Sequence, residues 1–381
     1  MDLELINDIN NDEIIDKGGE EEEIEELDIR ACKFSTYGGD FLIRQLTSMI
    51  EEDEIETPKI QRHYVWTNKI ASRFIESILL DLPLPSIFLA KNESGKFVIV
   101  DGLQRLTTLY KYIVDETVNG KTFKLSTSKD IRSEWRGKAF RELTVEDQRR
   151  LKNKLLHAII VEQKEPTNFD GLFLIFERIN TGGLQLNQQE IRNAIFQYPI
   201  NSLIDELNRD KVWRKMFGMD EPHARMRDNE MILRFLALKN LSIIDYKNET
   251  MKMVSTLNAF MANNRKASDD RLDYYRKDFL KTISTVNQLY GKNIFRTNIN
   301  THQVSQKFYA TVYDAIMLST AFAIEKNINF ASFTDTNDRI VNLFNDNEFK
   351  QACNAHTTDT SSIKKRIEIA CRELYDLKYE K

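Results

Sequence analysis

The amino-acid sequence predicts an α+β fold in which a small α/β domain is followed by a larger, all-helical domain. Short apolar runs bounded by turn residues, which are typical of strands, precede Pro166. From Asn168 onward, apolar residues recur at helical spacing almost without interruption. We therefore expect three segments: an acidic, disordered leader over 1–31, an α/β domain over 32–166 and a helical domain over 167–381.

The α/β domain is expected to contain three helices and three strands. Thr67 suits the N-cap of the second helix, because its hydroxyl can accept a hydrogen bond from a free backbone N–H, and Pro83 ends that helix. The helices are predicted to begin at Phe41, after Thr67 and after Gly102, and the strands to cover 87–90, 96–100 and 156–162.

The helical domain shows no repeat period, so a solenoid is not expected. Asn187 stands three residues before Glu190, which is the spacing of a capping box at the start of a helix. The predicted helices cover 169–179, 188–198, 229–238, 250–263 and 274–289, and further helices follow to Tyr379.

Composition narrows the classes of protein. No apolar stretch approaches the roughly 20 residues that cross a bilayer, and the acidic N-terminus is unlike a signal peptide. The three cysteines are widely spaced, and neither they nor the five histidines suggest a disulfide framework or a structural zinc site. The sequence therefore predicts a cytoplasmic protein.

Charge is distributed unevenly along the chain. Residues 1–30 carry a net charge of −11, so residues 31–381 carry +6. The leader is interpreted as a solvated tail, or alternatively as a segment that covers a basic surface and competes with nucleic acid. Residues 121–154 hold eleven Lys or Arg against five Asp or Glu, with Trp135 and Phe140 among them. Nucleic-acid contacts are predicted for this segment at Lys129, Arg132, Arg136 and Lys138.

The strongest candidate site is the segment 97–109, FVIVDGLQRLTTL, in which an apolar strand meets Asp101-Gly102 and a helix begins at once. Glycine lets a backbone approach a ligand closely, and the unpaired N–H groups of a helix start favour phosphate. Arg105 is predicted to add a charged clamp, and Asp101 to hold Mg²⁺ or an attacking water. A purely structural turn remains the alternative.

Three further motifs accompany this turn. The segment 60–66, IQRHYVW, combines Gln61 and Arg62 with aromatic residues that can stack a base, or it is a plain edge strand. The segment 176–186, FERINTGGLQL, presents Arg178 and Asn180 beside a glycine-rich helix end, or it is a tight helix connection. In the segment 224–230, acidic residues lie near a helix start, where they suit the helix dipole.

Together these motifs resemble the N-terminal domain of GmrSD-type restriction endonucleases, whose members carry a QR-x-Y-x-W segment, a DGQQR loop and an F-x-R-I-N-x-G-G segment. The resemblance covers roughly residues 40–265. Leu103 replaces the first glutamine of the loop and His63 replaces a proline, which puts hydrolysis of a nucleotide in more doubt than its binding.

The resemblance implies a ParB/sulfiredoxin-like core that binds or hydrolyses a nucleoside triphosphate with Mg²⁺, in defence against phage. Asp101, Gln104 and Arg105 are the implied catalytic residues. The implied nucleotide-binding residues are Gln61, Arg62, Gly102, Thr107, Arg178 and Asn180.

The sequence therefore leaves three functions open. The first is a nucleotide-binding, hydrolysing regulatory subunit of a restriction system; hydrolysis and sensing alone both stay open. Residues 266–381 show no HNH nuclease pattern, so a separate nuclease effector is expected as a partner beside nucleotide and DNA. The second is a non-catalytic DNA-binding module with a vestigial nucleotide site. The third is a nuclease that uses Glu162, Lys164 and Asp101.

Overall fold

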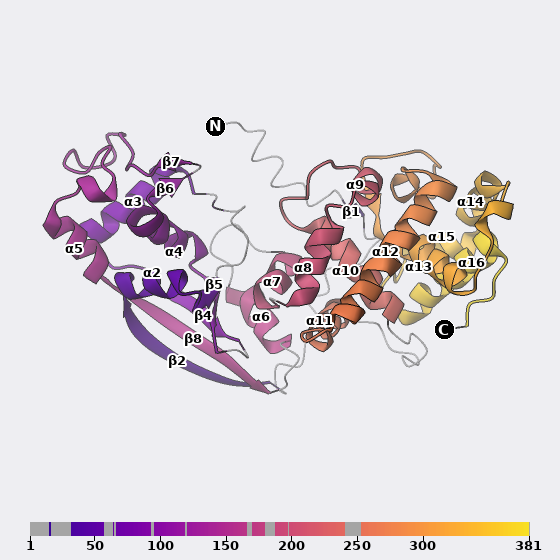
Figure 1. Ribbon diagram of the computed structural model, residues 1–381, viewed down its shortest axis with the longest axis horizontal. Helices are drawn as coiled ribbons and strands as arrows, with labels where there is room; N and C mark the ends of the chain where they lie inside the picture. Colours follow the sequence, from indigo (N-terminus) through magenta and orange to yellow (C-terminus); the bar gives the residue numbers. More distant parts are fainter. Residues whose placement is uncertain are drawn as a thin grey trace. The chain divides into compact units, whose positions relative to one another are not determined.

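The computed structural model describes most of the chain in several stretches, and its residues form two compact units (Figure 1). The α/β unit comprises Leu27–Leu186 and Ile191–Ile195, and the helical unit comprises Met1–Glu26, Asn187–Glu190 and Phe196–Lys381. The described residues are 15–16, 32–56, 64, 66–92, 95–118, 120–165, 170–179, 187–196, 198–240 and 253–380. A sheet in the N-terminal part and a mostly helical remainder confirm the predicted α+β class.

The α/β unit is built on a five-stranded mixed sheet with the strand order β2-β8-β4-β5-β3. β2 pairs antiparallel with β8, β8 parallel with β4, β4 antiparallel with β5, and β5 parallel with β3. The predicted strands over 87–90, 96–100 and 156–162 are confirmed, whereas β2 was not predicted. Their bounds are Lys33–Leu42 (β2), Ile55–Glu56 (β3), Ile87–Lys91 (β4), Phe97–Asp101 (β5) and Leu155–Glu165 (β8).

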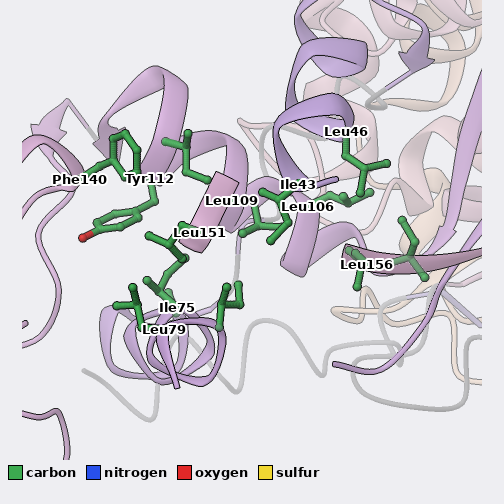
Figure 2. Packing of buried hydrophobic residues seen from close by; sticks show 14 of the residues in the cluster. Ile43, Leu46, Ile75, Leu79, Leu106, Leu109, Tyr112, Phe140, Leu151 and Leu156 are labelled. Carbon is green, nitrogen blue, oxygen red and sulfur yellow. The ribbon is translucent and has the colours of Figure 1, made fainter. Parts of the chain in front are cut away.

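One face of this sheet, here called the core face, is covered by helices that bury a single apolar core (Figure 2). Ile43 and Leu46 meet Leu106 and Leu109 in this core, and every one of these side chains is fully buried. The helices are α2 (Ile43–Glu51), α3 (Asn68–Leu79), α4 (Leu103–Tyr110) and α5 (Val145–Asn153). Thr67 caps α3 as predicted, since its hydroxyl accepts from the N–H of Ile70 at 3.4 Å. Shorter elements are a π-turn over Lys111–Asp115, β6 (Thr117–Val118), β7 (Lys121–Thr122) and a 3-10 turn over Phe140–Glu142.

The opposite face is covered in part by α6 (Asp170–Ile179). Its first turn lies against β8 and β2. The N–H of Leu172 donates to Gln163 of β8 at 2.7 Å, and a Cβ atom added at Gly171 would collide with the ring of Phe34 on β2. The helix also contacts β5, so it crosses this face of the sheet. Ala90 and Val98 are buried but lie outside the core of the other face, as the alternation of side chains along a strand requires.

The helical unit contains the remaining long helices, except that α7 (Gln188–Ile195) is divided between the two units after Glu190. α13 (Ala310–Glu325) is buried along most of its length. The predicted helices over 188–198, 229–238 and 274–289 correspond to α7, α10 and α12. The bounds are α7 (Gln188–Ile195), α8 (Pro199–Leu207), α9 (Lys211–Phe217), α10 (Arg227–Asn240), α11 (Met253–Asn263), α12 (Asp269–Tyr290), α13 (Ala310–Glu325), α14 (Thr336–Asn345), α15 (Asn347–Asn354) and α16 (Thr360–Tyr375), with 3-10 turns over Ile294–Arg296 and Phe330–Ser332. Among the described helices, none is both long and apolar enough to cross a membrane.

Two residues of the acidic leader have a defined place. Ile15 and Asp16 form β1, which pairs in parallel with β9 (Phe308–Tyr309). Ile15 is buried there. The other residues of the leader lie outside the described part, and the boundaries predicted at 31 and 166 stay predictions.

A buried ionic triad ties three helices of the helical unit together. The Asp314 carboxylate of α13 accepts from Arg234 of α10 at 2.7–2.9 Å and from Arg366 of α16 at 2.8 Å. All three side chains are fully buried. Arg366 also donates to the backbone oxygen of Thr357 at 2.7 Å. Because two guanidinium groups share one carboxylate, removing that carboxylate would leave two buried charges without their counterion.

We predict that Asp314→Ala lowers the free energy of unfolding by about 3–5 kcal/mol, because it leaves both arginines uncompensated. Urea denaturation of the full chain measures this change. Glu348→Ala is the control, since Glu348 forms an exposed ion pair with Lys365 and exposed pairs contribute little. An equal effect of the two substitutions would contradict the role assigned to the triad.

Candidate functional site

The turn from β5 to α4 depends on a glycine for two separate reasons. Gly102 has a φ of +100°, which side chains of L-residues rarely adopt. A Cβ atom at this position would also lie 2.5 Å from Cγ2 of Ile87. The predicted strand–glycine–helix turn is therefore present, and packing against β4 fixes the path of its backbone. The same turn leaves the first N–H groups of α4 without acceptors inside the helix.

Arg105 is held by internal acceptors. Its Nη1 donates to the backbone oxygens of Pro85 and Ser86 at 2.5 and 3.0 Å, and its Nη2 donates to Oδ2 of Asp101 at 2.6 Å. The side chain is only 12% exposed. Burial lowers the pKa of Arg105, and the neighbouring carboxylate of Asp101 opposes this shift. A guanidinium has five N–H donors, so Nε and one Nη2 hydrogen remain for other contacts.

Asp101 keeps one carboxylate oxygen for further contacts. Its side chain is 33% exposed and Oδ2 faces Arg105. Within the described part of the chain, Oδ1 forms no hydrogen bond. This arrangement orients the carboxylate, but it also means that Arg105 braces β4, β5 and α4 whether or not a ligand is present. The turn and the ion pair thus have a sufficient structural explanation, and a phosphate would have to use the donors that remain.

The second motif lies along α4. The hydroxyl groups of Tyr64 and Thr108 are 2.9 Å apart, and the N–H of Trp66 donates to Oε1 of Gln104 at 3.3 Å. Burial raises the pKa of Tyr64. The structure therefore places Tyr64 and Trp66, at the end of the segment 60–66, beside α4, the helix that follows the Asp101-Gly102 turn. Thr107 is half-buried on the same helix, whereas Gln61 and Arg62 lie outside the described residues.

The third motif is described only up to the end of α6. Arg178 is exposed in the last turn of this helix, and Asn180 lies outside the described residues. Because α6 crosses the sheet to contact β5, its C-terminal half approaches the strand that ends at Asp101. Whether Arg178 and Asn180 close a ligand site stays a prediction.

The predicted capping box at α7 is confirmed. Oδ1 of Asn187 accepts from the N–H of Glu190 at 2.9 Å, and Oε2 of Glu190 accepts from the N–H of Asn187 at 2.7 Å. Arg225 of the fourth motif pairs with Glu190 at 3.2 Å within the helical unit.

The fourth motif is part of a buried polar network. Asp228 is fully buried and pairs with Arg214 at 2.8 Å, and the carboxylate also accepts from the N–H of His223 at 2.8 Å. Burial lowers the pKa of Arg214. Arg227 and Glu230 form a further ion pair at 3.5 Å on the first turn of α10. These contacts give the segment 224–230 a structural role that its sequence pattern did not reveal.

The basic segment 121–154 presents fewer free cations than its composition suggests. Lys129 and Arg132 are exposed. Arg136 donates to the backbone oxygens of Ile131 and Lys129 at 2.5 and 3.0 Å, so it braces the loop between them. Lys138 is half-buried.

Trp135 does not contribute an aromatic surface for nucleic acid. It is 4% exposed, and its indole N–H donates to Asp147 at 3.2 Å. The expectation that Trp135 lies among the exposed cations is therefore wrong, because the loop folds its indole into the core of the unit.

The register of the sheet separates the carboxylates of the alternative nuclease site. Asp101 lies opposite Phe88 and Phe88 opposite Ile159, so Asp101 is level with Ile159, two strands away. Glu162 lies three residues farther along β8, which places the two Cα atoms roughly 14 Å apart. Glu162 pairs with Lys164 at 2.7 Å. Among the described residues, no group of three or more potential metal ligands gathers at one place.

One dyad was not found from the sequence. Nδ1 of His157 on β8 lies 2.7 Å from Oδ1 of Asp40 on β2, and both side chains are about half exposed. The two residues are 117 positions apart, so only the pairing of β2 with β8 brings them together. Recognising β2 as a strand would have been the signal, but its central glycines weaken the pattern that identifies strands.

Residues 43–197 match the family model described as GmrSD restriction endonuclease, N-terminal domain. No curated protein and no solved structure matches the chain.

We predict that Gly102→Ala destabilises the protein more than Gly120→Ala, by about 1–3 kcal/mol, because it overpacks the contact with Ile87. Gly120 is the matched control: its φ is also positive, at +72°, but no atom lies within 4 Å of an added Cβ. Chemical denaturation of both variants measures the difference. Equal destabilisation would show that backbone strain alone explains the requirement for glycine at position 102.

Proposed function

From the GmrSD-type N-terminal domain that residues 43–197 form, we propose that this protein is a component of a restriction or anti-phage defence system that acts on DNA. We further propose that its α/β unit binds a nucleoside triphosphate with Mg²⁺ at the turn between β5 and α4, and hydrolyses it. The observation that carries this second step is the oriented carboxylate of Asp101 beside a glycine-opened helix start.

The turn offers groups of the kinds that bind phosphate. The first N–H groups of α4 provide donors for an anion at the positive end of the helix dipole. Arg105 adds two N–H groups and fixes the orientation of Asp101 through the ion pair. Gln104 and Thr107 on α4, and Gln61 and Arg62 before it, are proposed to complete the phosphate contacts. Arg178 and Asn180 are proposed to cover them.

A single carboxylate suits Mg²⁺ at this position. Mg²⁺ bound with a nucleotide is commonly held by one or two carboxylates, phosphate oxygens and water. Oδ1 of Asp101 would provide the protein ligand, and the ion would neutralise charge that develops on the transferring phosphoryl group. The protein itself contributes mainly position and electrostatics: backbone N–H groups hold the phosphates, and Arg105 keeps Asp101 in place.

DNA binding is proposed at the exposed cations of the segment 121–154. Lys129 and Arg132 extend from a loop that Arg136 braces, and Lys138 follows in the same loop. Such cations bind DNA through its phosphates, independently of base sequence. A DNA-binding module that no longer uses its nucleotide site is the second candidate function, and the exposure of Lys129 and Arg132 favours it. We also propose that a separate nuclease subunit performs the cleavage.

We predict that Asp101→Asn lowers Mg²⁺-dependent release of phosphate from nucleoside triphosphates by about 100-fold or more, because it removes the charge that holds the ion. Asn still offers an acceptor to Arg105, so the brace of the turn is kept. Asp115→Asn, an exposed residue after the same helix, is the control.

Phosphate release that is unchanged in Asp101→Asn would refute this site. If the wild-type protein releases no phosphate from any nucleotide, hydrolysis is excluded. A nucleotide-dependent rise in its melting temperature would then still support binding, since a ligand of the folded state alone stabilises that state.

We predict that Lys129→Glu combined with Arg132→Glu weakens DNA binding and reduces the salt dependence of the affinity. Loss of two phosphate contacts should lower the slope of log K against log salt by about 2. Fluorescence anisotropy with duplex DNA at several salt concentrations measures both quantities. Lys378→Glu, which is 87% exposed in the helical unit, is the control, and an equal slope in both variants would contradict the assignment.

A further inference from the structure

The face of the sheet opposite the core carries partly exposed side chains on β4 and β8. The register places the Cα atoms of Asp101 of β5, Phe88 of β4 and Ile159 of β8 in one row, and the pairing of β4 with β5 is irregular between Phe88 and Leu89. Phe88 and Ile159 are half-buried and do not belong to the core cluster, unlike their neighbours Ile87 and Leu89. Phe88 and Ile159 therefore lie on the face opposite the core, level with Asp101 along the sheet.

His157 lies on the same face, two residues before Ile159 on β8. Its side chain is 47% exposed, and Nδ1 lies 2.7 Å from Oδ1 of Asp40 on β2. A Cβ atom at Gly38 would come within 2.9 Å of both Cε1 and Nε2 of the imidazole. Two residues of β2 therefore fix the ring: Asp40 binds one nitrogen, and Gly38 leaves room for the opposite edge.

The contact with Asp40 also determines the hydrogen-bonding character of the histidine. A carboxylate only accepts, so Nδ1 must carry the hydrogen that it shares with Asp40. In the neutral imidazole the other nitrogen, Nε2, is then an acceptor. Among the described residues, Nε2 has no hydrogen-bond partner. The face of the sheet opposite the core thus offers an oriented acceptor, Nε2 of His157, in addition to the ring of Phe88.

The separation of these groups matches one class of ligand. His157 and Asp101 are two strands and two residues apart, which corresponds to about 12 Å between their Cα atoms, and Phe88 lies between them. A molecule that extends across Phe88 would place an anionic end at Asp101-Gly102 and an uncharged, planar end at His157. A nucleotide has this construction, because its phosphates and its base lie at opposite ends of the sugar.

We propose that Phe88, Ile159 and His157, here called the base platform, bind the nucleobase of the nucleotide whose phosphates lie at the β5–α4 turn. Phe88 stacks on the base, and Nε2 of His157 accepts a hydrogen bond from an amino or imino group on its edge. Asp40 is a positioning residue that acts through His157. This inference rests on the proposed function, since it names the part of the ligand that the phosphate site leaves unassigned.

The experiment compares nucleoside triphosphates with inorganic triphosphate, which has the anionic end but no base. Binding of ATP, GTP, CTP, UTP and triphosphate to the full chain is measured by calorimetry in the presence of Mg²⁺. Phe88→Ala should weaken binding of the preferred nucleotide roughly tenfold or more, the range expected for loss of one stacked base. Its affinity for triphosphate should not change, which also shows that the variant is folded.

His157→Asn separates hydrogen bonding to the base from a purely structural role. An Asn amide can still donate to Asp40, so the link between β2 and β8 is kept while the acceptor at Nε2 is lost. The discrimination between nucleotides should therefore decrease, with no change for triphosphate. Asp40→Asn should have a similar effect, because an amide can donate to Nδ1 and shift the imidazole hydrogen to Nε2. His356→Asn, an 82% exposed histidine of the helical unit, is the matched control.

The outcomes separate the two proposals. If the wild-type protein binds neither nucleotides nor triphosphate, the proposed nucleotide function fails and the base platform fails with it. If it binds both equally well, or if Phe88→Ala and His157→Asn leave nucleotide binding unchanged, the phosphate site stands and the base platform is rejected. Equal loss of nucleotide and triphosphate binding in these variants would also reject it, because the effect would then be structural.

Discussion

The close approach of Gly102 to Ile87 is the constraint on which the α/β unit depends. At the same residue the chain leaves β5 in a left-handed conformation and starts α4 at once. Asp101 and Arg105 consequently lie one helical turn apart, at the spacing that lets their side chains pair. The same arginine reaches the carbonyl groups that precede β4, so a single turn fixes two strands and a helix together. Any chemistry at this turn is therefore built on groups that the fold already holds rigid.

The two units use charge in different ways. In the helical unit, carboxylates such as Asp314 and Asp228 are fully buried and neutralise arginines from other helices. In the α/β unit, Arg105 is mostly buried and Asp101 is one-third exposed, and their pair keeps hydrogen-bonding capacity on both partners. Buried networks of the first kind are costly unless complete, whereas a partly solvated pair can exchange partners with a ligand. This contrast is why we place the proposed site in the α/β unit.

Local patterns were sufficient for much of the fold. The capping box of Asn187 and Glu190 involves four consecutive residues, and its bonds follow from those residues alone. The dyad of Asp40 and His157 was out of reach because it needs the pairing of strands that are far apart in the chain. The burial of Trp135 within the basic segment did not follow from the sequence, since composition gives the charge of a segment but not which side chains the loop buries. At the site, the turn was predicted, and the internal partners of its arginine were not.

The pairing of β1 with β9 has a consequence for biosynthesis. Ile15 is translated about 290 residues before its partner Phe308. The segment Leu27–Leu186 of the α/β unit is complete well before then, and domains generally fold as units while the chain is still growing. β1 can therefore dock onto β9 only after Phe308 and Tyr309 have been translated, when the segment Leu27–Leu186 has already been made.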